Sequence, residues 1–174
     1  AGTADKSEIF SGVAMLLQDA DLQIIGATVS EHLLLSADLS LGQGQVAMDT
    51  AFAMAESLSL AESWDTPTPL LSYGQKRKLC LGAALLRRPQ LLLLDEPFSG
   101  LDYPAIVELC EILKNLTAQG MSLVTSTHDL EPFLDSMDYL LLFFEDGQTL
   151  CGNPEALLPK LREAGVRPVP SSSK

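Results

Sequence analysis

The sequence is poor in positive charge. Its 174 residues include 11 Lys and Arg against 23 Asp and Glu, so the formal net charge at pH 7 is −12. A surface of that sign repels phosphate backbones, which argues against nucleic acid as the main partner. It does not exclude a nucleotide, because a small phosphate site can lie inside an acidic protein.

Long apolar runs and a secretory leader are also missing. No apolar run approaches the roughly 20 residues that span a bilayer, and the first ten residues have no basic start followed by an apolar core. The three cysteines, Cys80, Cys110 and Cys151, are widely spaced and include no CxxC pair. This usage argues against a disulfide framework or a zinc site, and it predicts buried thiols in a reducing cytoplasm.

Three short apolar runs are present, and each leads into polar residues. They occupy 11–18, 90–95 and 121–129, within a sequence that is 47% hydrophobic and therefore globular. Helical patterns separate the runs. Strands therefore alternate with helices along the chain, and the strands are almost continuously apolar. This pattern predicts an α/β fold, in which buried strands form a parallel sheet covered on both faces.

Helices are predicted in the intervening segments. The sequence from Val29 to about Glu62 is rich in Leu, Ala and Met and predicts a small helical region, broken near Gly42. Another helix is expected to open at Ser72 and end before Pro89, and a third to cover 103–120. We expect the basic runs at 76–78 and 87–88 to be solvated, and we assign His32 no role.

The C-terminal part predicts smaller elements. Residues 130–137 suit a short helix, for which Asp129 is a candidate cap. Residues 138–152 suit a hairpin with a type I′ turn at Asp146-Gly147. A final helix is predicted over 153–166, with Asn153 as its N-cap.

Two adjacent acids, Asp95 and Glu96, follow four leucines. Ligands of open parallel sheets bind at the carboxyl ends of the strands, which is where this pair falls. An Asp there can hold hydrated Mg²⁺, and a neighbouring Glu can orient and deprotonate an attacking water. The alternative is two carboxylates at a solvent-exposed strand end, and the pair alone does not decide between these interpretations.

Five motifs together are more specific. They are Gln18 within LLQDADLQ, LSYGQ at 71–75, LLLLDEP at 91–97, SGLD at 99–102 and STHD at 126–129. Their types, order and separations resemble those of the ATP-binding subunits of ABC transporters over most of the chain. In chain order they look like the Q-loop glutamine, the signature motif, the Walker B strand, the D-loop and the switch histidine. Tyr73 stands where the family's signature motif more commonly has Gly.

The resemblance implies ATP and Mg²⁺ as cofactors, and a P-loop NTPase-like core with a small helical signature subdomain. It implies that Asp95 holds Mg²⁺, that Glu96 activates the attacking water and that His128 contacts the γ-phosphate or this water. Gln18 would sense Mg²⁺ or the water and would also count as a metal ligand.

The resemblance also implies that the active site is shared between two subunits. Ser72, Tyr73, Gly74 and Gln75 would bind the γ-phosphate of a nucleotide held by a second ATPase subunit, identical or different. A helix opening at these residues would present free N–H groups and a positive dipole end, which suit an anion. Asp102 would bridge the two subunits.

Three stretches are similar to the cobalt, nickel and vitamin importers of the energy-coupling-factor group. They are QDADLQIIGATV, LSYGQKRK and GNPEALLPKLREAGVRPVP. In that group the segment after the Q-loop docks a helix of a transmembrane permease, so Asp19 to Val29 are expected to line a groove for it. The implied location is cytoplasmic, on the inner face of the cell membrane.

The resemblance divides the chain into four parts. Residues 1–28 would hold a core strand and the Q-loop, and 29–88 the helical signature subdomain. Residues 89–166 would form the α/β core with Walker B, the D-loop and the switch histidine. A tail at 167–174 is expected to be disordered.

One family motif is missing. No GxxxxGK[ST] run occurs in the 174 residues, although the family uses such a P-loop to cradle the β- and γ-phosphates. We therefore expect an N-terminal segment to be absent, the incomplete sheet to leave apolar surface open, and this chain alone to hydrolyse ATP hardly at all. Two alternatives stay open: a non-catalytic dimerisation or regulatory module, and an ABC-type ATPase of DNA repair.

Overall fold

The computed structural model describes residues 12–134 and 136–166. The chain divides into two compact units, Ala1–Ser126 and Thr127–Lys174, and each is described by itself. The tail predicted at 167–174 lies outside the described residues. The boundaries predicted from the resemblance stay a prediction.

A three-stranded parallel sheet organises the first unit. Strands β1 (Val13–Leu16), β2 (Leu91–Asp95) and β3 (Ser122–Ser126) lie in the order β1-β2-β3. Leu16 pairs with Leu94 in this register. The prediction of a parallel sheet is therefore confirmed for the described strands.

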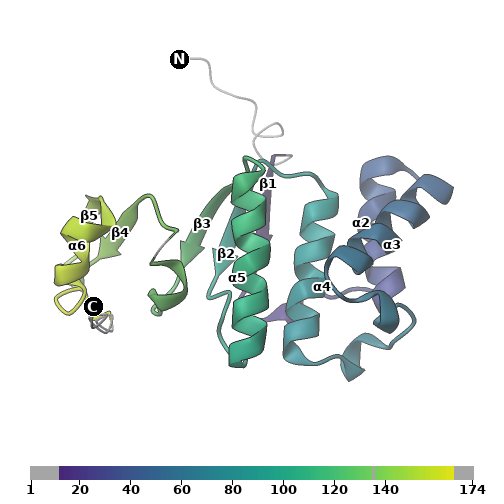
Figure 1. The fold of residues 1–174 in the computed structure, drawn as a ribbon, viewed down its shortest axis with the longest axis horizontal. Coiled ribbons are helices and arrows are strands. Elements are labelled where there is room, and N and C mark those ends of the chain that lie inside the picture. The colour runs from purple at the N-terminus through teal and green to yellow at the C-terminus, as the bar shows by residue number, and fades with distance from the viewer. Residues whose placement is uncertain (1–11, 135, 167–174) are drawn as a thin grey trace, which may run out of the picture. The chain divides into compact units, whose positions relative to one another are not determined.

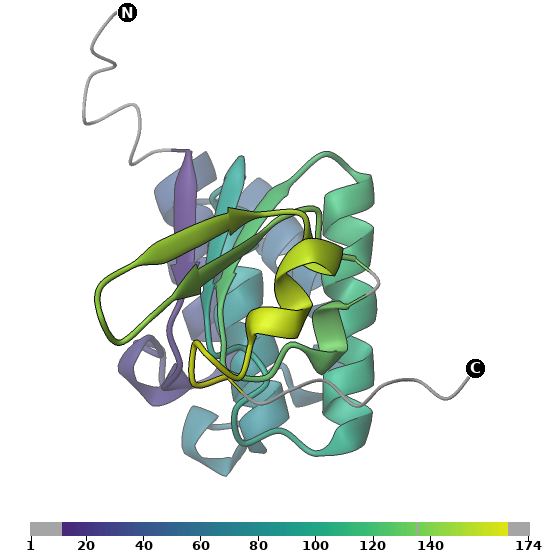
Figure 2. The same ribbon diagram turned by 90° about the vertical axis from the view of Figure 1, so that its left-hand side faces the viewer.

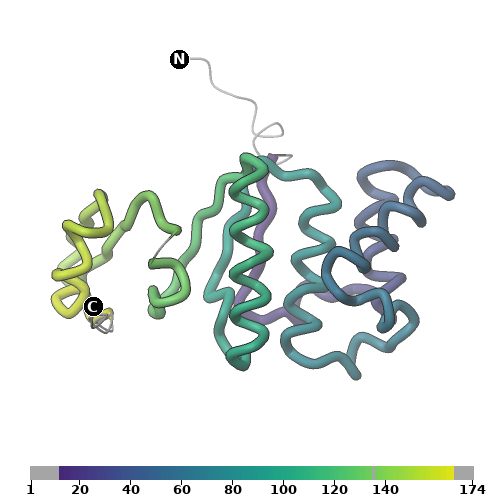
Figure 3. Tube along the Cα trace, in the orientation of Figure 1, coloured from purple at the N-terminus to yellow at the C-terminus, as the bar shows by residue number. Residues whose placement is uncertain are grey.

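Helices connect these strands. Between β1 and β2 the chain passes through α2 (Val29–Leu41), α3 (Gln45–Ser57) and α4 (Tyr73–Leu86), and α5 (Tyr103–Ala118) joins β2 to β3 (Figure 3). Three single-turn 3₁₀ helices also lie in the first connection: η1 (Ala20–Leu22), η2 (Ala61–Ser63) and η3 (Thr68–Leu70). Figures 1 and 2 show α4 and α5 on the same face of the sheet. This follows because both connections are right-handed and both step across the sheet in the same direction, from β1 to β2 and from β2 to β3.

The helix ends follow local chemistry. Thr28 caps α2, with its side chain accepting a hydrogen bond from the N–H of Glu31. The predicted break between α2 and α3 is confirmed at Gly42, which has a φ of 77° that glycine adopts without steric cost. Gly120, with a φ of 93°, follows the end of α5 in the same way.

The two faces of the sheet differ in burial. Leu16, Leu92 and Leu94 are buried on the face that the helices cover. On the opposite face Met15 is 45% exposed and Val124 is 57% exposed, and both are in register with Leu93. The prediction of burial on both faces is therefore wrong for the described residues, and β3 is not a buried strand. Alternate residues of β3 face the side that no described helix of the first unit covers.

The second unit is a hairpin with short helices. Strands β4 (Leu140–Phe143) and β5 (Thr149–Gly152) pair antiparallel, and α6 (Pro154–Leu157) follows them. Single 3₁₀ turns, η4 (Glu131–Phe133) and η5 (Leu158–Lys160), complete the described elements. Five buried leucines form the core of this unit: Leu130, Leu140, Leu142, Leu157 and Leu161.

Three local predictions in this unit are wrong. The helix predicted over 130–137 is a single 3₁₀ turn, Glu131–Phe133, among the described residues. The hairpin turn is not type I′, because Gly147 has a positive φ of 83° and Asp146 does not. The N–H of Gly147 donates to the carbonyl of Phe144, so the loop is a three-residue turn ending in a left-handed glycine. The final helix is also shorter than predicted, because Pro159 lacks the N–H that would continue it.

The cysteines are not uniformly buried. Cys80 is buried on α4, and burial raises the pKa of its thiol to about 12. Cys110 is half-buried and Cys151 is exposed on β5, so the prediction of buried thiols is wrong for Cys151. Its strand belongs to a two-stranded hairpin, and such a hairpin leaves one face to solvent. In the described part of the chain, no helix combines the length and apolar character needed to cross a membrane.

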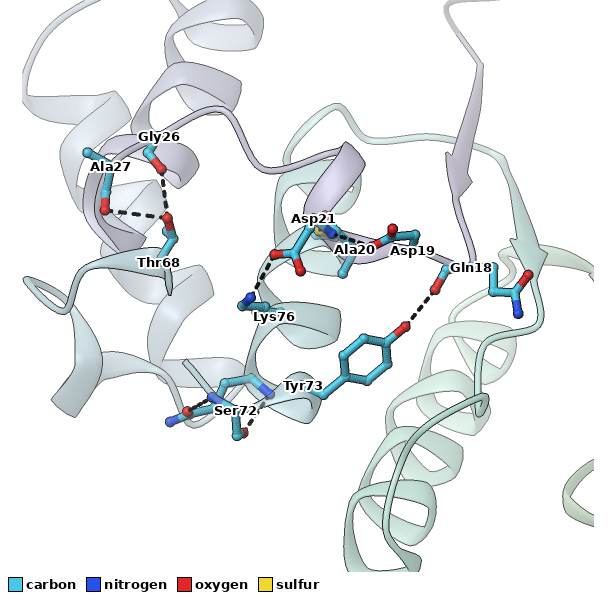
Figure 4. A network of polar contacts seen from close by, with 12 residues as sticks. Gln18, Asp19, Ala20, Asp21, Gly26, Ala27, Thr68, Ser72, Tyr73 and Lys76 are labelled. Carbon is cyan, nitrogen blue, oxygen red and sulfur yellow. Dashed lines mark hydrogen bonds and ion pairs between the residues drawn. The ribbon is translucent and has the colours of Figure 1, made fainter. Parts of the chain in front are cut away.

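The segment before α2 packs tightly on the start of that helix. A Cβ added to Gly26 would lie 2.3 Å from the backbone nitrogen of His32 and 2.7 Å from its Cα. The hydroxyl of Thr68, the first residue of η3, donates to the Gly26 carbonyl at 3.1 Å (Figure 4). Glycine at position 26 thus permits the close approach of two backbone segments.

Replacing this glycine tests the close approach. Gly26→Ala is expected to destabilise the first unit by about 2 kcal/mol, because backbone atoms must move to admit the methyl group. Thermal unfolding followed by the fluorescence of Trp64, the single tryptophan, measures the effect. Gly152→Ala is the control, since its Cβ would meet Leu157 at an ordinary 3.8 Å. Equal midpoints for Gly26→Ala and the unaltered chain would contradict this packing.

His32 generates a second prediction. Its ring is buried, Nδ1 accepts the N–H of Ile25 at 3.3 Å, and Nε2 has no hydrogen-bond partner among the described residues. Burial lowers the pKa of His32 from its ordinary 6.5. As pH falls, His32 therefore becomes protonated in the unfolded chain before it does so in the folded chain. The free energy of unfolding is unaffected by this group above about pH 6.5 and decreases as pH falls below that value.

We expect the unfolding midpoint to fall between pH 7.5 and pH 5.5 in the unaltered chain. His32→Asn keeps a hydrogen-bond acceptor but does not titrate, so its midpoint should fall less over the same interval. Chemical unfolding at both pH values, followed by Trp64 fluorescence, measures the difference. Identical pH dependence in the two proteins would show that His32 does not titrate on unfolding.

Candidate functional site

Three of the predicted catalytic and metal residues lie at or just beyond the ends of two neighbouring strands. Leu16 at the end of β1 pairs with Leu94 of β2, so Gln18 and Glu96 each lie two residues beyond paired positions. Asp95 closes β2 and pairs with Ser126 of β3. The carboxyl edge of the sheet in the first unit therefore receives the polar residues that the sequence predicts there. The side chain of Gln18 is exposed at this edge.

Glu96 has an unusual backbone. Its φ is +44°, in the left-handed region that costs a non-glycine residue on the order of 1–3 kcal/mol. Its N–H donates to the Ser126 carbonyl at 2.9 Å, which extends the β2–β3 pairing by one residue. Its carbonyl accepts the N–H of Ser99 at 3.1 Å. The chain therefore turns sharply at the predicted catalytic residue, a feature that the sequence pattern did not indicate.

Asp95 offers an oxygen donor of the type that Mg²⁺ prefers. The hydroxyl of Ser126 donates to Asp95 Oδ1 at 2.5 Å and orients the carboxylate at the strand end. No cluster of three or more His, Cys, Asp or Glu that could hold a metal occurs in the described residues. One carboxylate fits Mg²⁺ that keeps several waters and contacts substrate phosphates, and it does not fit a metal held by protein ligands alone.

The first turn of α4 is built around a capping box (Figure 4). Ser72 Oγ accepts the N–H of Gln75 at 3.2 Å, and Gln75 Oε1 accepts the N–H of Ser72 at 2.9 Å. The predicted anion site is thus partly occupied by the chain itself. Among the described residues we find no acceptor for the N–H groups of Tyr73 and Gly74, and these two are available to an anion at the helix start.

Gly74 and Asp102 have roles within the first unit. A Cβ on Gly74 would lie 3.3 Å from the Cβ of Ala105, so glycine lets the start of α4 approach the start of α5. Asp102 caps α5, where its carboxylate accepts the N–H of Ala105 at 3.0 Å. Asp102 is exposed, and its predicted contact with a second subunit stays a prediction.

The basic run at 76–78 is not a solvated face, contrary to the prediction. The Arg77 side chain is fully buried, and Lys76 and Lys78 are mostly shielded. Lys76 pairs with Asp21 at 2.7 Å (Figure 4), and Lys78 pairs with Glu108 at 2.8 Å. All three basic side chains therefore hold α4 to its surroundings, whereas the 87–88 pair is exposed as predicted.

Arg77 is the main residue of the site that the sequence analysis missed. Its guanidinium donates to the backbone carbonyls of Leu17 and Gln18, beside the predicted Q-loop glutamine. A signal was present, because positions 77, 81 and 84 follow the helical period on one face of α4. Leu81 and Ala84 are buried, so the helical period places Arg77 on the buried face.

The predicted docking segment exposes apolar side chains. Leu22 is 76% exposed and Ile25 is 81% exposed, whereas Ala20 is fully buried. Asp19 caps the short η1 turn by accepting the N–H of Asp21 at 3.0 Å. The segment is thus anchored by Asp19, Ala20 and the Lys76–Asp21 pair while it presents apolar groups to solvent.

His128 and Asp129 belong to the second unit. His128 is exposed. Asp129 Oδ1 accepts the N–H of Glu131 at 3.2 Å, but the N-cap of η4 is Leu130, so the prediction of Asp129 as the helix cap is wrong. The placement of His128 beside Gln18 and Glu96 stays a prediction, as does each catalytic role.

The chain is similar to a described protein family and to several individual proteins. Residues 63–135 match a family described as an AAA domain, putative AbiEii toxin, Type IV TA system. The chain is 39% identical to the cobalt import ATP-binding protein CbiO of Rhodobacter capsulatus, covering 90% of this chain and 57% of that protein. It is 33% identical to a putative ABC transporter ATP-binding protein of Halobacterium salinarum, covering 91% of this chain and 68% of that protein.

The fold agrees with this sequence similarity. The solved structure of cbiO1 from Clostridium perfringens, described as part of the ABC transporter complex cbiONQ, superposes with a TM-score of 0.74. The superposition covers 90% of this chain and 65% of that chain, at 23% sequence identity. The predicted P-loop NTPase-like α/β class is therefore confirmed, and this chain belongs to the family of ABC transporter ATP-binding proteins.

Proposed function

We propose that this chain is part of an ATP-binding and ATP-hydrolysing subunit that powers an importer of the cobalt, nickel or vitamin type. The relative from Rhodobacter capsulatus, which is named for cobalt import, supports this class of transport. The chain spans just over half the length of that relative, so hydrolysis, substrate and partners are assigned to the whole subunit by inference.

One observation supports the proposal above the others. The parallel pairing of β1 with β2 brings Gln18 and the Asp95–Glu96 pair to the same edge of one sheet. The first turn of α4 contacts this edge, since the Tyr73 hydroxyl donates to the Gln18 carbonyl at 2.8 Å. A glutamine and two carboxylates thus lie at one edge of the sheet, which suits the handling of a triphosphate, and the Tyr73 side chain links that edge to a helix start of the kind that binds phosphate.

The chain's own residues would divide the work. Asp95, oriented by Ser126, would hold Mg²⁺, which when bound neutralises phosphate charge. Glu96 would orient and deprotonate the attacking water, with Gln18 close to the same water. The N–H groups of Tyr73 and Gly74 would bind the γ-phosphate of a nucleotide held by a second ATPase subunit. His128 would contact the γ-phosphate of the nucleotide beside Asp95 and Glu96, or the attacking water.

A transmembrane permease is the proposed membrane partner. The exposed Leu22 and Ile25 lie within the 19–29 segment and suit an apolar helix of that permease. We place the subunit in the cytoplasm, on the inner face of the membrane, where such a permease helix would be reached. Nucleic acid is not a proposed partner, because the net charge of −12 opposes it.

Complementation tests the shared site. We expect the purified chain alone to hydrolyse ATP no faster than background, since it contains no GxxxxGK[ST] run. Mixed with a second family subunit, this chain should restore ATP turnover. That second subunit carries the GxxxxGK[ST] run but has its own signature serine replaced by Arg, so it depends on the signature motif of this chain. Ser72→Arg in this chain should reduce the restored rate at least tenfold, because the bulky side chain blocks the helix start. The rate of ATP hydrolysis is measured from the phosphate released.

Ser40→Arg is the matched control, because Ser40 is an exposed serine in the last turn of α2 and not on the signature helix. Its restored rate should equal that of the unaltered chain. A mixture with no turnover above background would contradict the proposal and favour a non-catalytic module. Rapid turnover by the chain alone, abolished by Glu96→Gln, would show that the phosphate site needs no such run.

A further inference from the structure

Arg77 connects one helix to the ends of two strands. It lies one turn into α4, and its side chain is fully buried. Nη1 donates to the Leu17 carbonyl and Nη2 to the Gln18 carbonyl, the latter at 2.7 Å. Nη2 also lies 3.4 Å from the Glu96 carbonyl. A single guanidinium therefore contacts the backbone of both Gln18 and Glu96.

A buried cation at this position requires compensation. Removing a guanidinium from water costs free energy unless its N–H groups find acceptors, and here Nη1 and Nη2 donate mainly to backbone carbonyls while Nε has no partner among the described residues. The planar fork of Arg can contact several carbonyls at once, which the single ammonium of Lys cannot reproduce. The left-handed turn at Glu96 fits this arrangement, because its carbonyl lies within reach of Arg77.

Tyr73 supports the same contacts from one turn earlier. Its hydroxyl donates to the Gln18 carbonyl at 2.8 Å, and its ring centre lies 5.4 Å from the guanidinium carbon of Arg77. In Figure 4 the Gln18 carbonyl faces Tyr73 while the Gln18 side chain points away from it. A Cβ on Gly100 would lie 3.2 Å from the Tyr73 ring, so the ring also packs against the SGLD segment.

We propose that Arg77 is a positioning residue, aligned by Tyr73, that ties the backbones of Gln18 and Glu96 to the signature helix. The side chains of Gln18 and Glu96 then keep their relative positions only while α4 is in place. The roles of Gln18 and Glu96 in hydrolysis rest on the proposed function. The mechanical link between α4 and these two residues does not rest on it.

A purely space-filling role for Arg77 gives a different expectation. Loss of a space-filling side chain would lower the overall stability and would loosen all segments around α4 alike. If Arg77 is a positioning residue, its loss should loosen the segments 17–23 and 95–100 together, because its guanidinium contacts both. Backbone amide exchange resolved by segment separates these cases.

Hydrogen exchange of the nucleotide-free chain, followed by mass spectrometry, tests the link. Tyr73→Phe removes one hydroxyl and keeps the ring, so exchange in 17–23 should be on the order of fivefold faster. Arg77→Lys keeps the charge but loses the fork, so both 17–23 and 95–100 should exchange on the order of tenfold faster. The thermal midpoint of Tyr73→Phe should stay within about 2 °C of the unaltered chain.

Lys78→Gln is the matched control. Lys78 is the next residue on α4, with a similarly shielded side chain, and it pairs with Glu108 rather than with the two strand ends. Its 17–23 and 95–100 segments should exchange at the unaltered rate. Unchanged exchange in 17–23 for Tyr73→Phe, or equal effects of Arg77→Lys and Lys78→Gln, would overturn the proposal. Because no nucleotide is present, this result is independent of the complementation assay.

Discussion

The parallel pairing of β1 with β2 is the constraint on which the rest of the first unit depends. The two strands are separated in the sequence by three helices, yet Leu16 and Leu94 are register partners. Because side chains alternate along each strand, this register fixes which residues enter the core and which reach the edge. A shift by one residue would bury Met15 and expose Leu16, and it would change which backbone carbonyls lie near Arg77.

The start of α4 shows how a structural role and the proposed phosphate-binding role can fall on one helix turn. A helix N-terminus has unpaired N–H groups that need acceptors in the absence of a ligand. Ser72 and Gln75 supply two of these acceptors through the capping box. The turn is therefore already formed before any phosphate arrives, and binding would not have to order it.

Much of the fold and part of the site could be predicted from the sequence. The four leucines of β2 predicted a core strand, and Ser72 correctly predicted where α4 begins. The burial of Arg77 was missed because a run of basic residues usually lies on a solvated surface. Which side of α4 is buried depends on the segments that pack against this helix. The left-handed conformation of Glu96 was missed because it depends on long-range contacts with Ser126 and α4.

The exposure of β3 shows a different limit. Apolar residues in a strand predict burial, but the pattern alone does not say whether both faces find a partner. Val124 belongs to such a pattern and is nevertheless more than half exposed. The short α6 shows the opposite case, since Pro159 was visible in the sequence and its effect on the helix was underestimated.

The sheet face that no described helix of the first unit covers has a consequence for cooperativity. Met15, Leu93 and Val124 form a row that runs across the three strands rather than along one of them. β1 and β3 do not pair directly, and each is joined to the other only through β2. A single element laid along this row would contact all three strands at once, and it would turn two separate strand pairings into one that melts as a unit.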